Sequence, residues 1–231
     1  MTAKALLFDV FGTCVDWRTS IAREVATAFT TPLSAQEALA FADAWRGEYD
    51  PAMARVRNGT RGYVPLDDLH RENHDTVAAR FGLTPADPVT LARAWERLSP
   101  WPDTTQALAI MRKTALIAPC SNGSIALMTH LARYAKLPWD CILGAEIARD
   151  YKPKPAVYLA SCAALRLDPC DVMMVAAHNN DLHAARDAGL QTAFVPRLTE
   201  YGPDQTTDLA PEADWDIIAS DFTDLATRIT A

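Results

Sequence analysis

Apolar residues are grouped along the chain in short runs, each of which ends in small or polar residues. Five such runs are long enough to be strands, and amphipathic stretches with helical spacing separate most of them. The runs occupy residues 5–9, 115–122, 171–181, 192–197 and 215–220. Strands buried on both faces read as continuous apolar runs, so this pattern predicts a parallel sheet of the α/β class.

Residues 16–98 have a different pattern, which contains no strand-like apolar run. Their apolar positions follow helical spacing, most clearly over 35–57 and 65–83. Pro100 and Pro102 then mark the return to the α/β pattern. A helical insertion therefore follows the first predicted strand.

The two patterns together predict an α/β fold: a Rossmann-like parallel sheet core with an inserted helical cap subdomain. The core comprises residues 1–15 and 99–231, and the cap comprises residues 16–98. A chain of 231 residues is long enough to bury a sizeable hydrophobic core.

Charge and cysteine usage narrow the classes of partner. The net charge of −7 argues against nucleic acid or an anionic membrane as the main partner, although a small anionic substrate stays open. The five cysteines are scattered and show no CxxC spacing, which fits a reducing cytoplasm better than disulfides or a zinc site. The first apolar run is too short for a signal peptide, and no run reaches transmembrane length. We expect a cytoplasmic protein.

Polar residues follow several of the predicted strands: Asp9, Ser121 with Asn122, and the group 178–181. The carboxyl ends of parallel strands form one edge of a sheet, so these residues are expected to converge there. Asp9 is the candidate nucleophile, because backbone N–H groups of the turn after it can hold a carboxylate and an incoming anion. Asp9 as a cap of the next segment, and Ser121–Asn122 as an ordinary turn, are the alternatives.

Lys152 is the candidate cation of this site. Pro153 and Pro155 stiffen the chain around it and favour a fixed position for its side chain. A positioned ammonium would orient a carboxylate nucleophile and lower its pKa. A solvated surface lysine is the alternative, and it is the interpretation we keep for Lys154.

Four short motifs occur in an order that resembles the haloacid dehalogenase-like hydrolase superfamily. They are FDVFGT (8–13), SNG (121–123), YKPKP (151–155) and HNND (178–181). The resemblance covers the whole chain, including a helical cap after the first strand, and within the superfamily it is closest to the (S)-2-haloacid dehalogenases.

Phe11 decides between reactions within this superfamily. Its phosphatases have a second acid at this place, which protonates the leaving oxygen, and phenylalanine cannot do so. They also bind magnesium through the nucleophile and an acid of the fourth motif. In that motif Ala176 and Ala177 offer no ligand here, and only Asp181 is left. A leaving halide needs neither the proton nor the metal. The resemblance thus implies dehalogenation without metal or cofactor, and a phosphatase or other hydrolase with an altered metal site is the alternative.

A third branch, the phosphonoacetaldehyde hydrolases, also lacks the second acid but needs a Schiff-base lysine in the cap. Residues 14–98 contain no lysine. This branch is therefore disfavoured on its chemistry.

The resemblance also implies a role for each matching residue. Asp9 would displace halide from C2 of a short 2-haloacid, and water would hydrolyse the resulting aspartyl ester to a 2-hydroxy acid. Thr13 would hydrogen-bond the Asp9 carboxylate, and Lys152 would pair with it. Asp181 would help to hold Lys152 and the water, while Tyr158 would support the lysine at the edge of the binding pocket.

The substrate itself would be held at two ends. Ser121 and backbone N–H groups near Val10 and Phe11 would anchor its carboxylate. Arg46 of the cap would face the departing halide, a role that suits a guanidinium because it stays charged and is weakly hydrated, with Asn122 as its partner. A solvated helix arginine is the alternative for Arg46.

The chain departs from the dehalogenases in the fourth motif, where Ala176 and His178 stand in place of a serine and an asparagine. His178 is expected to act either as a general base toward water or as a donor to the halide, and a strand-end histidine bonded to backbone is the alternative. A pocket altered in this way would favour small substrates such as chloroacetate or fluoroacetate.

The motifs assign no role to two cap histidines and to one polar segment near the C-terminus. His70 and His74 are expected to be solvated or at the edge of the core, because no third metal ligand is evident near them. Residues 198–209 are expected to form a loop near the rim of the site. A homodimer is compatible with the sequence.

Overall fold

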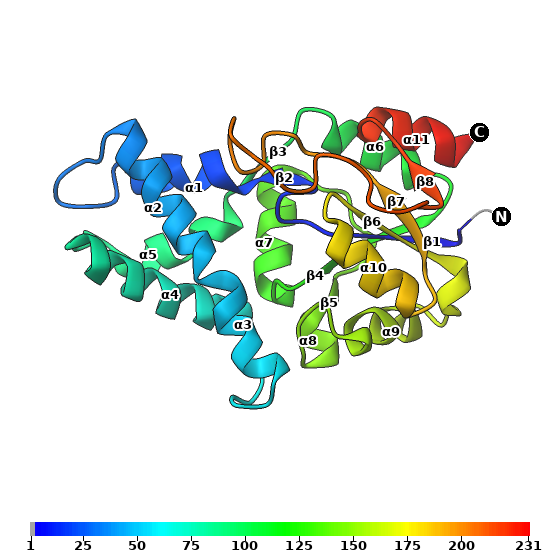
Figure 1. Ribbon diagram of the computed structural model, residues 1–231, viewed down its shortest axis with the longest axis horizontal. Coiled ribbons are helices and arrows are strands. Elements are labelled where there is room, and N and C mark those ends of the chain that lie inside the picture. The colour runs from blue at the N-terminus through cyan, green and yellow to red at the C-terminus, as the bar shows by residue number, and fades with distance from the viewer. Residues whose placement is uncertain (1–2) are drawn as a thin grey trace.

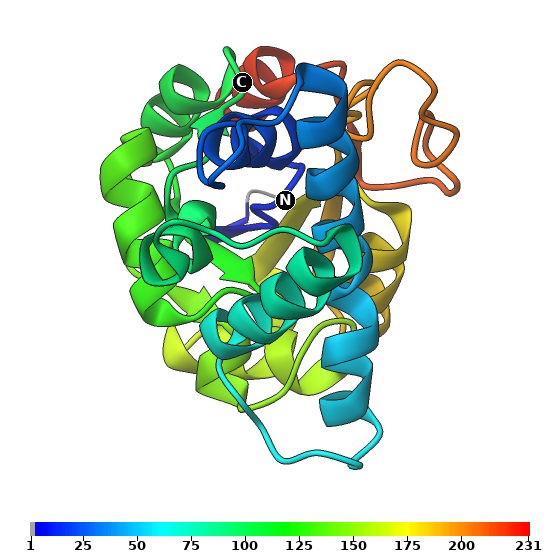
Figure 2. The same cartoon turned by 90° about the vertical axis from the view of Figure 1, so that its left-hand side faces the viewer.

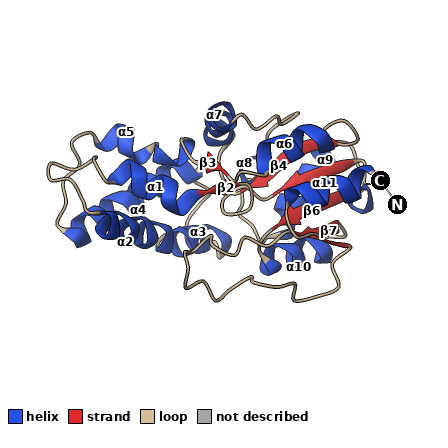
Figure 3. Cartoon of the chain, turned by 90° about the horizontal axis from the view of Figure 1, so that it is seen from above, coloured by secondary structure: helices blue, strands red, loops and turns tan. Residues whose placement is uncertain are grey.

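The computed structural model describes residues 3–231, with a sheet at one end of the molecule and a group of helices at the other (Figures 1 and 3). Six parallel strands form the sheet in the order β5-β4-β1-β6-β7-β8. They are β1 (Ala5–Phe8), β4 (Leu116–Ser121), β5 (Leu143–Gly144), β6 (Val172–Ala176), β7 (Gln191–Phe194) and β8 (Ile217–Ile218). The predicted α/β class is confirmed. The pattern did not reveal β5, which has only two residues.

β1 lies in the middle of the sheet, between β4 and β6, and all four of its side chains are fully buried. Leu6 and Phe8 pack in one hydrophobic cluster with α6, α7 and α11, whereas Ala5 and Leu7 pack in a second cluster with α9 and α10. Burial on both faces is why the strand reads as an unbroken apolar run. The helices of this region are α6 (Thr104–Met111), α7 (Ile125–Ala135), α8 (Ala145–Ala148), α9 (Pro155–Ala164), η2 (Pro169–Asp171), α10 (Asn179–Asp187) and α11 (Phe222–Thr230).

A second group of helices occupies the chain between β1 and α6. It comprises α1 (Trp17–Val25), α2 (Ala35–Gly47), α3 (Tyr49–Arg57), α4 (Leu66–Phe81), α5 (Pro88–Ala92) and η1 (Ala94–Glu96). The chain enters and leaves this group through β2 (Val15–Asp16) and β3 (Ser99–Pro100), which pair antiparallel. Because this two-stranded ribbon carries both connections, we propose that residues 16–98 form a cap and the rest of the chain forms the core.

The helical stretch 35–57 is interrupted at Glu48, between α2 and α3. The cause is local: Pro51 has no N–H to donate to the carbonyl of Gly47, so a continuous helix would lack that hydrogen bond. The break turns the chain between Arg46, near the end of α2, and Tyr49, the first residue of α3.

His70 and His74 of α4 are each only 1% exposed, so the prediction that they are solvated or at the edge of the core is wrong. They lie within the aromatic interior of the cap, where His70 stacks on Trp95 with 4.2 Å between ring centroids and His74 packs against Trp45. Burial and the nearby Arg46 charge hold the pKa of His70 well below its usual value.

The carboxyl ends of the strands face the cap. Seen from the cap end, the helices of residues 17–96 stand in front of the sheet, and the loop that follows β7 lies beside α2 (Figure 2). Within residues 3–231, no helix combines the length and the apolar character needed to cross a bilayer. The fold therefore presents the strand ends and the cap to each other, with a space between them for a site.

Candidate active site

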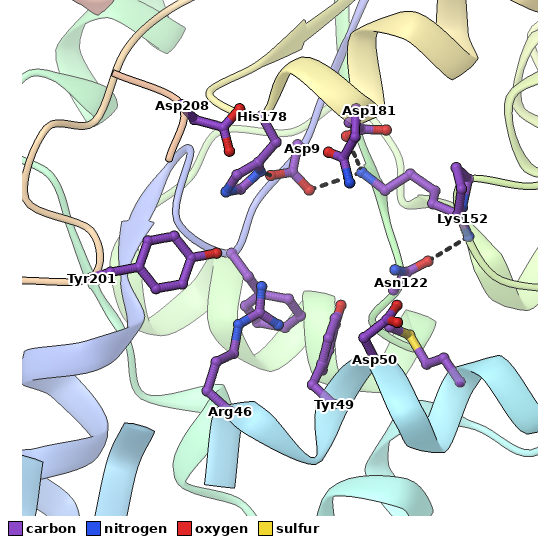
Figure 4. Close-up of a pocket in the computed structure, with 14 residues that line it drawn as sticks. Asp9, Arg46, Tyr49, Asp50, Asn122, Lys152, His178, Asp181, Tyr201 and Asp208 are labelled. Atoms are coloured by element: carbon purple, nitrogen blue, oxygen red, sulfur yellow. Dashed lines mark hydrogen bonds and ion pairs between the residues drawn. The ribbon is translucent and has the colours of Figure 1, made fainter. Parts of the chain in front are cut away.

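A cavity of about 250 Å³ lies between the strand ends and the cap (Figure 4). Side chains from three parts of the chain line it. The core contributes Asp9, Asn122, Lys152, His178 and Asp181, the cap contributes Arg46, Tyr49 and Met53, and the loop after β7 contributes Tyr201 and Asp208. Nearly all of these groups are polar, which indicates a site for a small charged ligand.

Asp9 follows β1 directly, and its carboxylate is held by three side chains. Oδ1 accepts a hydrogen bond from Lys152 Nζ at 2.8 Å. Oδ2 accepts one from Thr13 Oγ1 at 2.7 Å and lies 3.1 Å from His178 Nδ1. The Thr13 hydroxyl is itself oriented, because it accepts from the Ala177 N–H at 2.9 Å and must therefore direct its proton to Asp9.

Lys152 bridges two carboxylates and is only 7% exposed. Its Nζ lies 2.8 Å from Asp9 Oδ1 and 2.5 Å from Asp181 Oδ2, while its backbone N–H donates to Asn122 Oδ1 at 2.8 Å. Tyr158 donates its hydroxyl to Asp181 Oδ1 at 2.5 Å and does not line the cavity, so it supports the ion pair from behind without facing a ligand.

These contacts keep Asp9 ionised. Burial by itself would raise the pKa of Asp9, but the Lys152 ammonium and His178 outweigh it and hold that pKa well below its usual range. Burial would lower the pKa of Lys152, and Asp181 with Asp9 raises it well above its usual value instead. The site thus holds an unprotonated carboxylate beside a charged lysine, as a carboxylate nucleophile requires.

Glu200, in the loop after β7, is the main residue that sequence reasoning missed. Its Oε2 lies 2.8 Å from His178 Nε2, and its Oε1 accepts a hydrogen bond from Trp17 Nε1 at 2.9 Å. The carboxylate is buried, with only 1% of the residue exposed. No local sequence pattern indicates Glu200, because its contacts with His178 and Trp17 join residues far apart in the chain and depend on how the loop folds back.

The turn after Asp9 has room for the Glu200 carboxylate because residue 12 is a glycine. It has φ +89°, and a Cβ at this position would lie 2.1 Å from Glu200 Oε1. A side chain here would therefore both strain the backbone and collide with the carboxylate. The glycine of the FDVFGT motif serves the approach of Glu200 as well as the turn itself.

Arg46 faces Asp9 from the opposite side of the cavity (Figure 4). Its guanidinium lies over the rings of Tyr49 and Trp17, at 4.0 and 5.5 Å from their centroids. Its NH1 is buried and has no hydrogen-bond partner among the described residues. An uncompensated buried cationic donor is costly, so this end of the cavity is suited to an anion.

Ser121 ends β4 and is 1% exposed, with its Oγ accepting from the Gly123 N–H at 3.1 Å. It does not line the cavity. The backbone N–H groups of Val10 and Phe11 have no acceptor among residues 3–231 and lie in the turn that follows Asp9. Free N–H groups beside the nucleophile form a small anion-binding feature.

The loop at residues 198–209 also supplies Tyr201 and Asp208. Tyr201 packs edge-on against Trp17 and its hydroxyl points into the cavity (Figure 4). Asp208 accepts from the N–H of Asn179 at 2.7 Å, and so caps α10. The expected loop near the rim is thus a wall of the cavity itself.

The chain was compared with known proteins. A family model described as haloacid dehalogenase-like hydrolase matches residues 3–189. An (S)-2-haloacid dehalogenase of Xanthobacter autotrophicus is 27% identical over 211 residues, which cover 85% of this chain and 76% of that enzyme.

Two solved structures are also similar. The defluorinating L-2-haloacid dehalogenase Rha0230 is 47% identical with a TM-score of 0.93, and the alignment covers 99% of this chain and 96% of that one. The L-2-haloacid dehalogenase PA0810 is 45% identical, also with a TM-score of 0.93, and 99% of each chain is covered. The similarity therefore extends over both the sheet and the helical group.

Proposed function

Because the chain belongs to the haloacid dehalogenase-like hydrolase family, we propose that it is a metal-independent hydrolase of the carbon–halogen bond in short 2-haloalkanoic acids. The observation that carries the proposal is that Asp9, ionised and held by Lys152, lies across the cavity from Arg46, whose buried NH1 has no hydrogen-bond partner among the described residues. Proteins 45% and 47% identical to this chain are described as L-2-haloacid dehalogenases, which supports the same reaction here.

The first step is displacement of halide from C2 of the substrate. The Asp9 carboxylate attacks C2, the new C–O bond forms as the carbon–halogen bond breaks, and the electron pair leaves with the halide. Attack from the side opposite the leaving group fits a cavity with Asp9 at one end and Arg46 at the other. The Arg46 guanidinium stabilises the charge that develops on the halide.

The second step is hydrolysis of the aspartyl ester. Water attacks Cγ of Asp9 and passes a proton to Asp181, whose pKa burial and the Asp9 charge raise although Lys152 opposes them. Collapse of the tetrahedral intermediate breaks the bond from Cγ to the ester oxygen. That oxygen takes the proton from Asp181 and leaves as the hydroxyl group of a 2-hydroxy acid, with inverted configuration at C2. The second proton of the water leaves Asp9 for the solvent, which restores the carboxylate.

The substrate carboxylate belongs beside the turn after Asp9. The free N–H groups of Val10 and Phe11 are suited to hold it. A cavity of about 250 Å³ lies below the ~300–1,000 Å³ typical of sites for drug-sized ligands, and Phe11, Tyr49 and Met53 form its apolar wall. We therefore propose haloacetates as better substrates than longer 2-haloacids.

A phosphatase is the second candidate within this family, and the residues of this site do not fit the magnesium ion it would need. The Lys152 ammonium contacts both Asp9 Oδ1 and Asp181 Oδ2, the two oxygens best placed to be ligands. Thr13 and His178 occupy Asp9 Oδ2. Phe11 supplies no acid for a leaving alkoxide. These contacts favour halide as the leaving group.

The proposal is tested by measuring halide release from chloroacetate, fluoroacetate and 2-chloropropanoate in the presence of EDTA, beside phosphate release from an aryl phosphate. We expect halide release that EDTA does not reduce and that Asp9→Asn abolishes. Magnesium-dependent phosphate release without halide release would overturn the proposal. Full activity of Asp9→Asn, with mass spectrometry showing that the amide is intact, would exclude the covalent route.

A cytoplasmic location is proposed as well. All five cysteines are free thiols in the structure, and Cys14, Cys120 and Cys162 are buried. Free thiols are typical of a reducing compartment. Fractionation of the source cells tests this, and recovery of the protein in an oxidising compartment would contradict it.

A further inference from the structure

We propose that His178 is a catalytic residue of ester hydrolysis: its doubly protonated ring, held by Glu200, donates Nδ1–H to Oδ2 of Asp9 and stabilises the oxyanion formed when water attacks the ester. Glu200 is then a positioning residue that acts through His178. The inference rests on the proposed function and assigns His178 a role other than general base or halide donor.

The contacts of the His178 ring settle its protonation. Nδ1 lies 3.1 Å from Asp9 Oδ2 and Nε2 lies 2.8 Å from Glu200 Oε2. An ionised carboxylate only accepts hydrogen bonds, so a ring between two of them must carry a proton on both nitrogens. Neither nitrogen then has a lone pair with which to take a proton from water.

Glu200 is built into this arrangement. It is 1% exposed, Trp17 Nε1 donates to its other oxygen, and Gly12 leaves room for its carboxylate. A buried carboxylate is strongly unfavourable unless a cation pairs with it. His178 is the cation in contact with Glu200, so the two side chains keep each other charged.

The charges around His178 agree with this assignment. Three carboxylates lie around it: Asp9 after β1, Asp181 on α10 and Glu200 in the loop after β7. Two cations are nearby, Lys152 from the segment before α9 and Arg46 from α2. A protonated His178 brings these three anions and three cations into balance. Asp50, Asp208 and two tyrosines, Tyr49 and Tyr201, also line the cavity. Asp50 pairs with Arg57 at 2.6 Å, Asp208 binds the amino end of α10, and the two tyrosines stay neutral phenols.

The same environment determines the titration of His178. Burial by itself would lower the pKa of His178, but Glu200 and Asp9 outweigh it and raise that pKa well above its ordinary value. The imidazolium therefore persists at neutral pH.

The hydrogen bonds of Asp9 identify which oxygen becomes the oxyanion. Oδ2 accepts from Thr13 and His178, whereas Oδ1 accepts only from Lys152. The oxygen with fewer donors is the freer nucleophile, so Oδ1 forms the bond to C2 and Oδ2 becomes the ester carbonyl. When water adds to Cγ, the charge that develops on Oδ2 meets two donors already in place, as in an oxyanion hole.

Position within the cavity argues against the role of halide donor. His178 lies on the side of Asp9, and Arg46 lies across from it (Figure 4). A halide displaced by in-line attack leaves away from Asp9, and so away from His178.

The test is rapid-quench kinetics of Glu200→Gln and His178→Leu with chloroacetate, following halide release and 2-hydroxy acid formation separately. We expect halide release in the first turnover to change by less than about tenfold, and ester hydrolysis to slow by about 10²–10³-fold in His178→Leu, which has no hydrogen-bond donor. Intact-protein mass spectrometry should then show the Asp9 ester accumulating. Glu72→Gln, which alters an acid of the cap that pairs with Arg61 outside the cavity, should accumulate no ester.

A pH profile gives a second readout, which loss of structure alone would not produce. The protonated form of His178 is the active one, so hydrolysis is lost as pH rises through its pKa. Removing the Glu200 charge lowers that pKa, so the alkaline limb of Glu200→Gln should move to lower pH. Equal slowing of halide release and hydrolysis in both variants, or an unmoved alkaline limb, would overturn the inference. A wild-type protein that released no halide would instead overturn the proposed function.

Discussion

Replacing Lys152 with alanine is the sharpest single perturbation of the site. The change removes the one cation between Asp9 Oδ1 and Asp181 Oδ2, at 2.8 and 2.5 Å, and leaves two carboxylates facing each other in a buried position. Lys154→Ala is the matched control, because it removes the same side chain two positions away, where the residue is exposed.

The expected loss of stability in Lys152→Ala follows from the burial of the ion pair. Removing one partner of a buried ion pair destabilises a protein by about 3–5 kcal/mol, because the remaining charge is left uncompensated. Lys152 is 7% exposed, so solvent screening does not reduce this figure much. We expect Lys152→Ala to lower the free energy of unfolding by about 3–5 kcal/mol near pH 8, and Lys154→Ala to change it by less than about 0.5 kcal/mol.

The loss should depend on pH, with a sign that the structure determines. In the native protein Lys152 keeps the pKa of Asp9 low. Without the lysine, Asp9 keeps His178 as a partner, but Asp181 is left with no cation in contact among the described residues. Burial and the Asp9 charge then raise the pKa of Asp181 further, so the folded variant binds protons more tightly than its unfolded chain does. Its stability therefore falls as pH rises through this range, and the gap from the wild type is largest near pH 8 and narrows toward pH 4.

Urea unfolding at several pH values measures this gap, and halide release measured on the same samples reports the nucleophile. Asp9 loses the ammonium that orients Oδ1, so halide release by Lys152→Ala should be strongly reduced at every pH tested. If Lys152→Ala were as stable as Lys154→Ala, or if its deficit did not vary with pH, the assignment of Lys152 as the cation that pairs with the two buried carboxylates would be wrong.

Three further predictions concern other parts of the site. Gly12→Ala should lower the free energy of unfolding by more than about 2 kcal/mol, because φ is +89° and the added Cβ would meet Glu200. Gly62→Ala is the control and should be nearly neutral, because nothing lies within 4 Å of its added Cβ. Thermal melts compare the two variants. Arg46→Lys should lower kcat/KM for halide release about 100-fold, since an ammonium lacks the fork of donors, and unchanged kinetics would remove Arg46 from halide binding. Haloacetates should be turned over faster than 2-halopropanoates, and much faster turnover of the propanoates would refute the proposed size limit.

The apolar runs predicted the sheet because burial on both faces leaves a direct mark on the sequence, as in β1. The same reasoning predicted that Asp9 and His178 would meet, since parallel strands end at one edge. The two residues do lie 3.1 Å apart, or one hydrogen bond. What could be predicted was therefore the part of the site that regular structure places.

Glu200 and the cap interior could not be predicted in the same way. Glu200 reaches His178 through an irregular loop, and the space that admits it depends on the backbone angle of Gly12. The sequence does not predict the burial of His70 and His74, because a polar residue on a helix is usually exposed and only the packing of the surrounding rings shows that these two are buried. Long-range packing and loop geometry set both outcomes, and neither leaves a periodic signal.

Oxygen labelling tests the covalent role of Asp9 most directly. Enzyme in excess is carried through one turnover of chloroacetate in heavy-oxygen water, and then through a second turnover in ordinary water. If Asp9 attacks C2, the hydroxyl oxygen of the first product comes from Asp9 and carries no label. Water leaves its oxygen on Asp9, so the second product carries label in proportion to the enzyme that turned over the first time. Label in the hydroxyl group of the first product would mean that water attacks C2 directly, and would contradict the aspartyl-ester mechanism.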